Sequence, residues 1–167
     1  PVAPMLAKSV PTIPSGELSF EPKWDGFRSI IFRDGDEVEI GSRNERPMTR
    51  YFPEVVEAVK RFLPERCVVD GEIIVVVGDR LEFQVLQQRI HPAASRVAML
   101  AGKTPSRFYA FDLLVDTRGQ LLAQKPLHQR RQKLEDFASR YLEADGQLRL
   151  SPATRSAKVA RAWLGAQ

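Results

Sequence analysis

Residues 67–77 form a run dominated by valine and isoleucine, and this run predicts a buried β-strand. It is interrupted only by Asp70-Gly71-Glu72. A carboxylate within a buried strand needs a partner, because an unpaired buried charge is costly. Such a local conflict between residue type and environment is typical of a functional position. The run therefore predicts a central strand that carries part of a site.

Other strands are predicted on both sides of this run. Residues 107–115 form a second strongly apolar stretch, and residues 148–150 a short third one. Residues 27–32 and 37–40 flank an Asp-Gly pair at 34–35, which is a strong hairpin signal. A sheet with mostly antiparallel strands is expected.

Helices are predicted between these strands from apolar residues at helical spacing. The expected helices cover residues 55–63, 83–90, 96–100, 126–141 and 156–164, the last capped by Ser156. Four prolines within residues 1–16 indicate an extended arm. The chain is expected to form one α+β unit, with mostly antiparallel sheets flanked by helices.

Composition limits the class of protein. The 167 residues are 43% hydrophobic and 28% charged, with a net charge of +4, which is compatible with a polyanionic partner without requiring one. The single cysteine, Cys67, excludes an internal disulfide framework and, with His91 and His128, makes no zinc pattern. The sequence shows no apolar run long enough to span a membrane and no secretory signal, so a cytoplasmic protein is expected.

The chemistry is concentrated in residues 19–28. Read as an extended segment, this stretch alternates between an apolar face and a charged face. Lys23 lies on the charged face between Glu21 and Asp25, and Gly26 then lets the chain turn. Lysine becomes a nucleophile when its surroundings favour the neutral amine. The segment alone is equally compatible with a solvated strand face that holds one ion pair.

The pattern Lys-x-Asp-Gly-x-Arg at residues 23–28 resembles the nucleotidyl-acceptor motif of ATP-dependent DNA ligases and their relatives, the mRNA-capping enzymes and RNA ligases. Four more stretches match this family in the right order, so the resemblance spans nearly the whole chain. They are Ser42-Arg43-Asn44, Asp70-Gly71-Glu72, Phe111-Asp112-Leu113-Leu114, and Pro126-Leu127 with Arg130-Arg131. In particular, the chain resembles the compact bacterial repair ligases.

The resemblance implies roles for the residues near the phosphates. Lys23 would attack the α-phosphate of ATP, expel pyrophosphate and hold AMP as a phosphoramide. Arg28 and Arg43 would contact ribose or phosphate, for which a guanidinium is well shaped. Glu72 would bind the ribose hydroxyl or take part in coordinating Mg²⁺ or Mn²⁺. The structural alternatives are strand-end arginines and an ion pair within the strand.

The resemblance also implies roles around the base. Phe111 would stack on adenine, with a plain core phenylalanine as the alternative. Glu21 would accept a hydrogen bond from the adenine amino group and so favour adenine over guanine. Asp25 and Asp70 would shape the site and buffer Lys23.

The last matching stretch lies on a predicted helix whose charged face carries Arg130, Arg131 and Lys133. We interpret this face as solvated surface, with DNA contact as the alternative.

The family normally carries a later Glu-Gly-x-x-x-Lys segment, a final lysine-bearing strand and an OB-fold domain, and none occurs here. Residues 1–167 are therefore expected to be the N-terminal majority of an adenylation domain. Nicked double-stranded DNA and DNA-repair proteins are the expected partners. Two alternatives remain: an RNA ligase or capping-type nucleotidyltransferase, and a non-catalytic DNA-binding module with the same fold.

Overall fold

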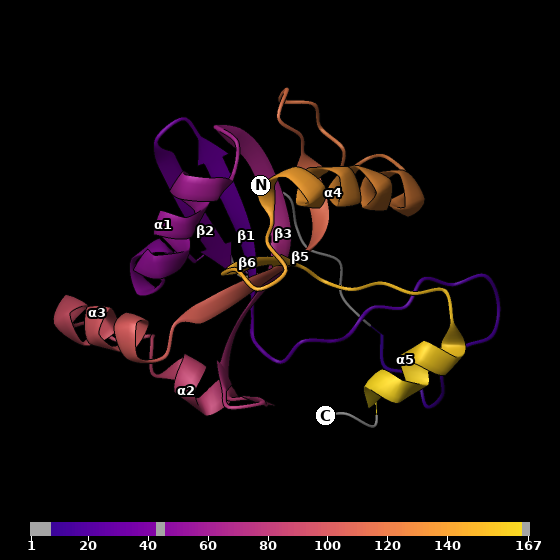
Figure 1. The fold of residues 1–167 in the computed structure, drawn as a ribbon, viewed down its shortest axis with the longest axis horizontal. Helices are drawn as coiled ribbons and strands as arrows, with labels where there is room; N and C mark the ends of the chain where they lie inside the picture. The colour runs from indigo at the N-terminus through magenta and orange to yellow at the C-terminus, as the bar shows by residue number, and fades with distance from the viewer. Residues whose placement is uncertain (1–7, 43–45, 165–167) are drawn as a thin grey trace.

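A computed structural model of the chain describes residues 8–42 and 46–164 (Figure 1). Its centre is a sheet with the strand order β2-β1-β3-β5-β6, to which β4 adds by pairing with β3. The strands are β1 (Phe27–Asp34), β2 (Glu37–Ser42), β3 (Arg66–Val77), β4 (Arg80–Leu81), β5 (Ser106–Val115) and β6 (Leu148–Leu150). All these pairs are antiparallel except β5 with β6, which is parallel.

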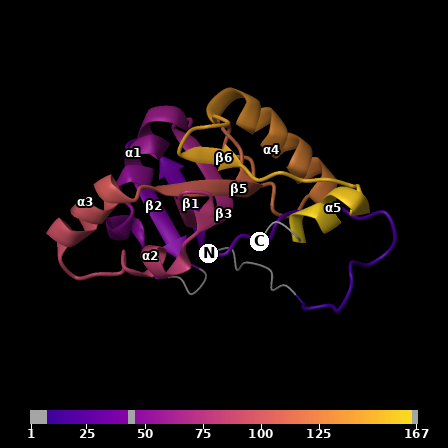
Figure 2. The ribbon, with the colours of Figure 1, turned by 60° about the horizontal axis from the view of Figure 1, so that its bottom comes forward.

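The helices connect the strands and cover the sheet. They are the 3₁₀-helix η1 (Thr49–Tyr51) and the α-helices α1 (Pro53–Phe62), α2 (Phe83–Gln87), α3 (Ala94–Lys103), α4 (Leu127–Tyr141) and α5 (Ala157–Leu164). In Figure 2, α1 and α4 lie above the sheet, whereas the N-terminal segment from residue 8 loops out beside α5. None of the described helices is long and apolar enough to cross a membrane.

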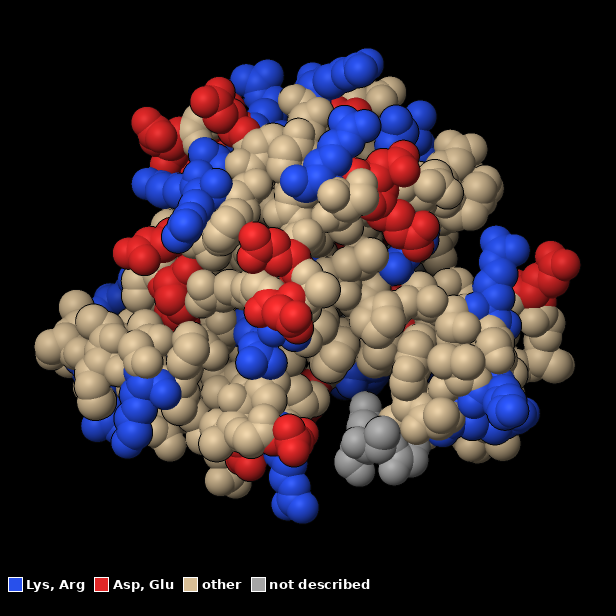
Figure 3. Space-filling view, viewed as in Figure 1, with Lys and Arg blue, Asp and Glu red and all other residues tan. Residues whose placement is uncertain are grey.

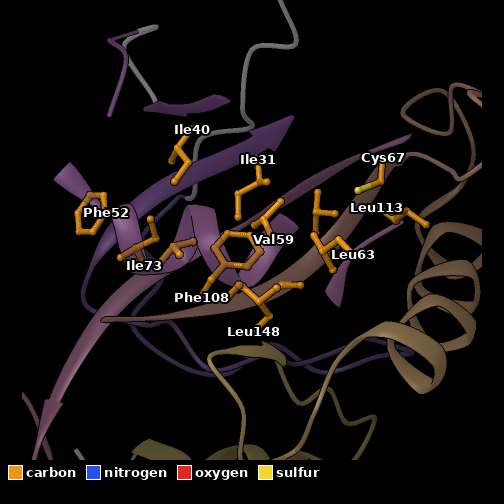
Figure 4. Packing of buried hydrophobic residues seen from close by; sticks show 14 of the residues in the cluster. Ile31, Ile40, Phe52, Val59, Leu63, Cys67, Ile73, Phe108, Leu113 and Leu148 are labelled. Atoms are coloured by element: carbon orange, nitrogen blue, oxygen red, sulfur yellow. The ribbon is translucent and has the colours of Figure 1, made fainter. Parts of the chain in front are cut away.

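The core lies between the sheet and the two helices α1 and α4. Alternation along each strand sends Ile31, Ile73 and Phe108 to one face, where they meet Val59 of α1 (Figure 4). Leu134 of α4 belongs to the same buried cluster. One face of the sheet is therefore committed to packing, and the opposite face is left for other residues.

The opposite face carries the polar side chains of the three central strands. Arg28 of β1 pairs with Glu72 of β3, which in turn pairs with Tyr109 of β5. Residues directly opposite each other on paired strands point to the same face of a sheet. These three side chains consequently form a row across the sheet, on the side away from α1.

A break in the β3–β5 register lies next to this row. Asp70 pairs with Asp112, but Gly71 pairs with Ala110, so Phe111 is an extra residue between them. A bulge of this kind re-aims a side chain and is common beside active sites. At Gly71, an added Cβ would lie 2.4 Å from the Phe108 ring and 2.4 Å from a β5 carbonyl oxygen. Only glycine fits this approach of the two strands.

The predicted α+β class, hairpin and central strands are confirmed. The bounds of two predicted helices differ: the helix predicted over 83–90 ends at Gln87, and the one predicted over 96–100 extends over residues 94–103. Leu127 at the start of α4 is 51% exposed, whereas Leu134 and Phe137 of the same helix belong to the buried cluster.

A buried ion pair joins four elements at the other end of the sheet. The guanidinium of Arg89, which is fully buried after α2, donates to the Glu54 carboxylate at the start of α1 and to the carbonyl oxygens of Tyr51 and Thr104. Glu54 also accepts from the backbone N–H and hydroxyl of Ser106, at the start of β5. The pair therefore fixes the ends of α1, α2, α3 and β5 to one another.

Replacing Arg89 should test this junction. Arg89→Met leaves Glu54 buried without its cation, so we expect the free energy of unfolding to fall by about 3–5 kcal/mol. Urea unfolding of the natural protein measures this change. The control is Arg66→Met, because the Arg66–Asp34 pair is exposed and should contribute less than about 1 kcal/mol. Equal effects of the two substitutions would contradict the proposed importance of the buried pair.

Candidate active site

The segment that carries Lys23 is attached to the sheet by its neighbours. Phe20 and Thr154 exchange two backbone hydrogen bonds of 2.7 and 2.9 Å. Trp24 Nε1 donates to Ser151 Oγ at 3.0 Å, and the Trp24 ring lies 4.2 Å from that of Tyr109, centroid to centroid. The predicted alternation is confirmed: Phe20 and Trp24 are half-buried, and Lys23 between them is exposed. The anchoring of the apolar face presents the amine on the other side.

Gly26 allows this segment to lie directly on β3. A Cβ at this position would lie 2.2 Å from the carbonyl oxygen of Ile73 and 3.0 Å from Glu72 Cγ. Any other residue would push the chain away from the sheet. The glycine of the motif thus brings Lys23 close enough to Glu72 for the lysine charge to lower the pKa of that carboxyl group.

Asp70 is paired with Arg28. Arg28 donates from Nε to Asp70 Oδ1 at 3.1 Å and from Nη2 to Oδ2 at 2.7 Å, a forked geometry. Burial raises the pKa of Asp70, whose side chain is 5% exposed, and the Arg28 fork opposes that rise. The expectation that Asp70 buffers Lys23 is therefore corrected: its hydrogen-bond partner is Arg28, whose side chain is 28% exposed on the same face of the sheet.

Phe111 lies beneath the same guanidinium. The Arg28 Cζ atom is 5.1 Å from the centroid of the Phe111 ring. Phe111 is half-buried and stands outside the apolar cluster, whereas its strand neighbour Phe108 is 1% exposed within it. Phe111 lies three positions after Phe108, so strand alternation places the two rings on opposite faces of the sheet. The core alternative for Phe111 does not describe its surroundings.

Glu72 is the most perturbed carboxyl group of this face. Burial raises its pKa to about 7, against the opposing charges of Lys23 and Arg28 and a hydrogen bond from the backbone of Gly26. Nearby Asp70 raises it further. A buried acid that titrates near neutrality beside a lysine is a typical feature of an active site.

The arginines of α4 are not a solvated surface, contrary to the sequence-based interpretation. The side chain of Arg130 is 14% exposed and donates to Asp112 of β5 at 2.9 Å. Arg131, also 14% exposed, approaches Glu21 at 3.7 Å and donates to the Ser151 carbonyl oxygen at 3.0 Å. Helical spacing could not reveal these pairs, because the partners lie on other elements. Lys133 is exposed as expected.

The residues that hold the lysine segment and the site in place were missed by sequence reasoning. Trp24 lies on the apolar face of residues 19–28, and no further role was predicted for it, for Ser151 or for Tyr109. A signal existed for Asp112 alone, since it is a carboxylate within an apolar strand, as Asp70 is. The other contacts depend on pairings between distant segments.

Two other residues, Arg43 and Asp25, belong to the predicted site. Arg43 lies outside the described residues. Asp25 is exposed beside Lys23. Among residues 8–42 and 46–164, no group of three histidine, cysteine, aspartate or glutamate side chains is arranged to hold a metal ion.

Known proteins resemble this chain in sequence and in fold. A family model described as "ATP dependent DNA ligase domain" matches residues 4–164. DNA ligase C of Mycobacterium tuberculosis is 55% identical over 98% of this chain and 45% of its own length, and DNA ligase C2 of Mycolicibacterium smegmatis is 54% identical over the same shares. The ligase domain of M. tuberculosis LigD superposes with a TM-score of 0.64 at 25% identity, over 87% of this chain and 44% of the other. The chain thus spans about half the length of the curated relatives it matches.

The raised pKa of Glu72 predicts a pH-dependent stability. In the folded protein this carboxyl keeps a proton between its ordinary pKa of 4.5 and about 7, whereas the unfolded chain loses it. The folded state therefore binds more protons in this window, and Glu72 makes stability fall as pH rises through it. Glu72→Gln removes this titration, so the variant should gain stability relative to wild type between pH 5 and pH 7.5.

Urea unfolding at the two pH values measures this difference, with Glu65→Gln as the control at an exposed position. A variant that loses stability at pH 7.5 would instead indicate that Glu72 is a structural ion-pair partner.

Proposed function

This chain belongs to the family of ATP-dependent DNA ligase domains, and from this membership we propose that Lys23 is the residue that becomes adenylated. The observation that carries the proposal is the gathering of three distant segments on one face of the sheet. Lys23 comes from the segment before β1, Glu72 from β3 and Phe111 from the bulge of β5, with Arg28 between them. Each matches the family motif assigned to it.

In the proposed reaction, Lys23 Nζ forms a bond to the α-phosphorus of ATP. The bond from that phosphorus to the bridging oxygen breaks, pyrophosphate leaves with the electron pair, and Nζ loses a proton. A neutral amine must therefore meet a polyanion, and cations have to offset the phosphate charge. Arg28, held in orientation by Asp70, is the described residue best placed to do so.

Glu72 would hold either the ribose hydroxyl or a divalent cation. Among the described residues, no group of three candidate ligands surrounds this carboxylate, and the nearby Asp70 is paired with Arg28. This fits Mg²⁺ or Mn²⁺, because such an ion is commonly bound by one or two carboxylates together with substrate phosphates and water. When bound, the metal would supply positive charge against the phosphates.

The base would lie on Phe111, with its amino edge toward Glu21. Phe111 offers a ring that is half-buried and outside the core. Glu21 lies two residues before Lys23 on the same side of the chain, so one segment would contact both the base and the α-phosphate.

The remaining steps are proposed for the whole protein. AMP would pass to the 5′-phosphate of nicked double-stranded DNA, and the nick would then be sealed, in the cytoplasm and together with DNA-repair proteins. Residues 1–167 would be the N-terminal majority of the adenylation domain. On the face shown in Figure 3, acidic and basic side chains are interspersed rather than gathered into one basic surface. We therefore assign the main DNA contacts to other surfaces of the protein.

Covalent labelling tests the proposed nucleophile. Incubation of the natural protein with α-labelled ATP and Mg²⁺ or Mn²⁺ should label Lys23, and Lys23→Ala should abolish the label because no other side chain can replace the amine. Mass spectrometry identifies the modified residue, and Lys133→Ala is the control at an exposed lysine. Labelling by GTP in place of ATP would favour a capping-type enzyme, and absence of any label would favour a non-catalytic module.

The role of Phe111 can be separated from packing within one strand. Phe111→Leu loses the flat ring, so ATP binding should weaken by roughly 1–3 kcal/mol, the scale of aromatic–base stacking. Folding should change little, because the ring is outside the core. Phe108→Leu is the matched control: it should lower the melting temperature and leave ATP affinity unchanged. Calorimetry and thermal unfolding of both variants give the comparison, and an unchanged affinity for Phe111→Leu would contradict stacking.

A further inference from the structure

The proposed site divides two tasks between residues that are two positions apart. Glu21 would face the base, and Lys23 would face the α-phosphate. Such a division works only if the segment cannot shift along the sheet. The contacts of Phe20 with Thr154 and of Trp24 with Ser151 hold its backbone and its apolar face. They do not hold the Glu21 carboxylate itself.

Arg131 is the side chain that contacts that carboxylate. Its Nη1 atom lies 3.7 Å from Glu21 Oε1 and, within the described part of the chain, is buried without a hydrogen-bond partner. The rest of its guanidinium is fixed, since Nη2 donates to the carbonyl oxygen of Ser151 at 3.0 Å and Nε to Glu135 at 2.8 Å. One buried donor is thus held toward Glu21 by a group that cannot easily turn away.

Ser151 connects this arginine to the lysine segment. It is 1% exposed, its backbone N–H donates to Ala110 of β5, and its hydroxyl accepts from Trp24. Its carbonyl oxygen accepts from Arg131. A single buried residue therefore holds both the neighbour of Lys23 and the partner of Glu21 against the sheet.

We propose that Arg131 is a positioning residue that sets base selection, by keeping Glu21 an oriented hydrogen-bond acceptor toward the adenine amino group. The inference rests on the proposed function, in which Lys23 is adenylated and Glu21 meets the base. A carboxylate only accepts hydrogen bonds, whereas a protonated carboxyl group can also donate one. Without Arg131, Glu21 would more readily hold a proton and could then donate to a carbonyl such as that of guanine.

The charges around Glu21 agree with this role. Burial raises the pKa of Glu21, Arg131 opposes the rise, and Asp112 adds to it. Asp112 is itself paired with Arg130, and Arg131 is shared with Glu135. Arg131 is therefore the cation that favours the ionised, accepting form of Glu21.

The experiment measures the rate of covalent labelling of Lys23 at varied ATP and GTP concentrations. Arg131→Gln should reduce the preference for ATP over GTP by roughly tenfold or more, the size expected for a lost hydrogen bond to a charged group. The change should appear mainly in the half-saturating ATP concentration rather than in the rate at saturation. It should also grow as the pH falls, because protonation of Glu21 competes with adenine recognition.

Three further variants complete the test. Arg131→Lys keeps the charge and should restore part of the preference, and it carries the test if Arg131→Gln fails to fold. Glu21→Gln should lower the preference by itself, and adding Arg131→Gln to it should cause no further loss, since both act through one carboxylate. Arg140→Gln, exposed near the end of the same helix, should leave the preference unchanged.

The outcomes separate the two proposals. A wild-type protein that labels Lys23 with ATP supports the proposed function, whatever the Arg131 variants do. If Arg131→Gln and Arg131→Lys then slow ATP and GTP labelling by the same factor, Arg131 is only structural and the inference is overturned. Additive effects of Glu21→Gln and Arg131→Gln would overturn it too. If the wild-type protein labels with neither nucleotide, both proposals fail.

Discussion

The forked ion pair between Arg28 and Asp70 is the interaction on which the polar face of the sheet depends. It joins the first strand of the hairpin to the central strand, and it holds a buried carboxylate that would otherwise be strongly unfavourable. The same guanidinium covers the Phe111 ring and lowers the pKa of Glu72. Removing either partner would leave the other buried without its counter-charge, so Phe111 and Glu72 depend on this pair as well.

The polar face nevertheless carries an excess of acid that this pair does not neutralise. The pKa values of Glu21, Asp70 and Glu72 are all raised, with burial as the largest cause in each case. Burying these carboxyl groups destabilises the protein without a ligand. It favours binding, because a hydrogen-bond donor or a cation brought by a ligand would stabilise their charged forms. The opposite face is mostly apolar and packs against α1 and α4, and its buried Arg33 donates to the carbonyl oxygens of Val59 and Leu63 at the end of α1. Because side chains alternate along each strand, one face of the sheet packs the core and the other carries the proposed site.

Much of this fold could be predicted from local pattern. The β-branched run of residues 67–77 and the Asp-Gly turn at 34–35 each determine a strand or hairpin without help from distant residues, and both are confirmed. The proposed roles of Lys23 and Glu72 came from motif resemblance, and they stay predictions. What could not be predicted was pairing across the chain. Arg131 contacts a carboxylate that lies 110 positions earlier, and a helical arginine gives no local sign of such a partner.

The direction of the Phe111 side chain could not be predicted from the sequence either, because it depends on how β5 pairs with β3. Alternation along β5 gives two answers for its direction: counted from Phe108 it faces the polar side, and counted from Leu113 it faces the core. The outcome depends on a register shift against β3, where Asp70 pairs with Asp112 and Gly71 with Ala110. That shift coincides with the close contact of Gly71 and Phe108, which no larger residue could make. The glycine between the two carboxylates of β3 therefore does more than separate them: by allowing β5 to approach, it permits the bulge that keeps Phe111 on the side of Arg28 while Leu113 returns to the core.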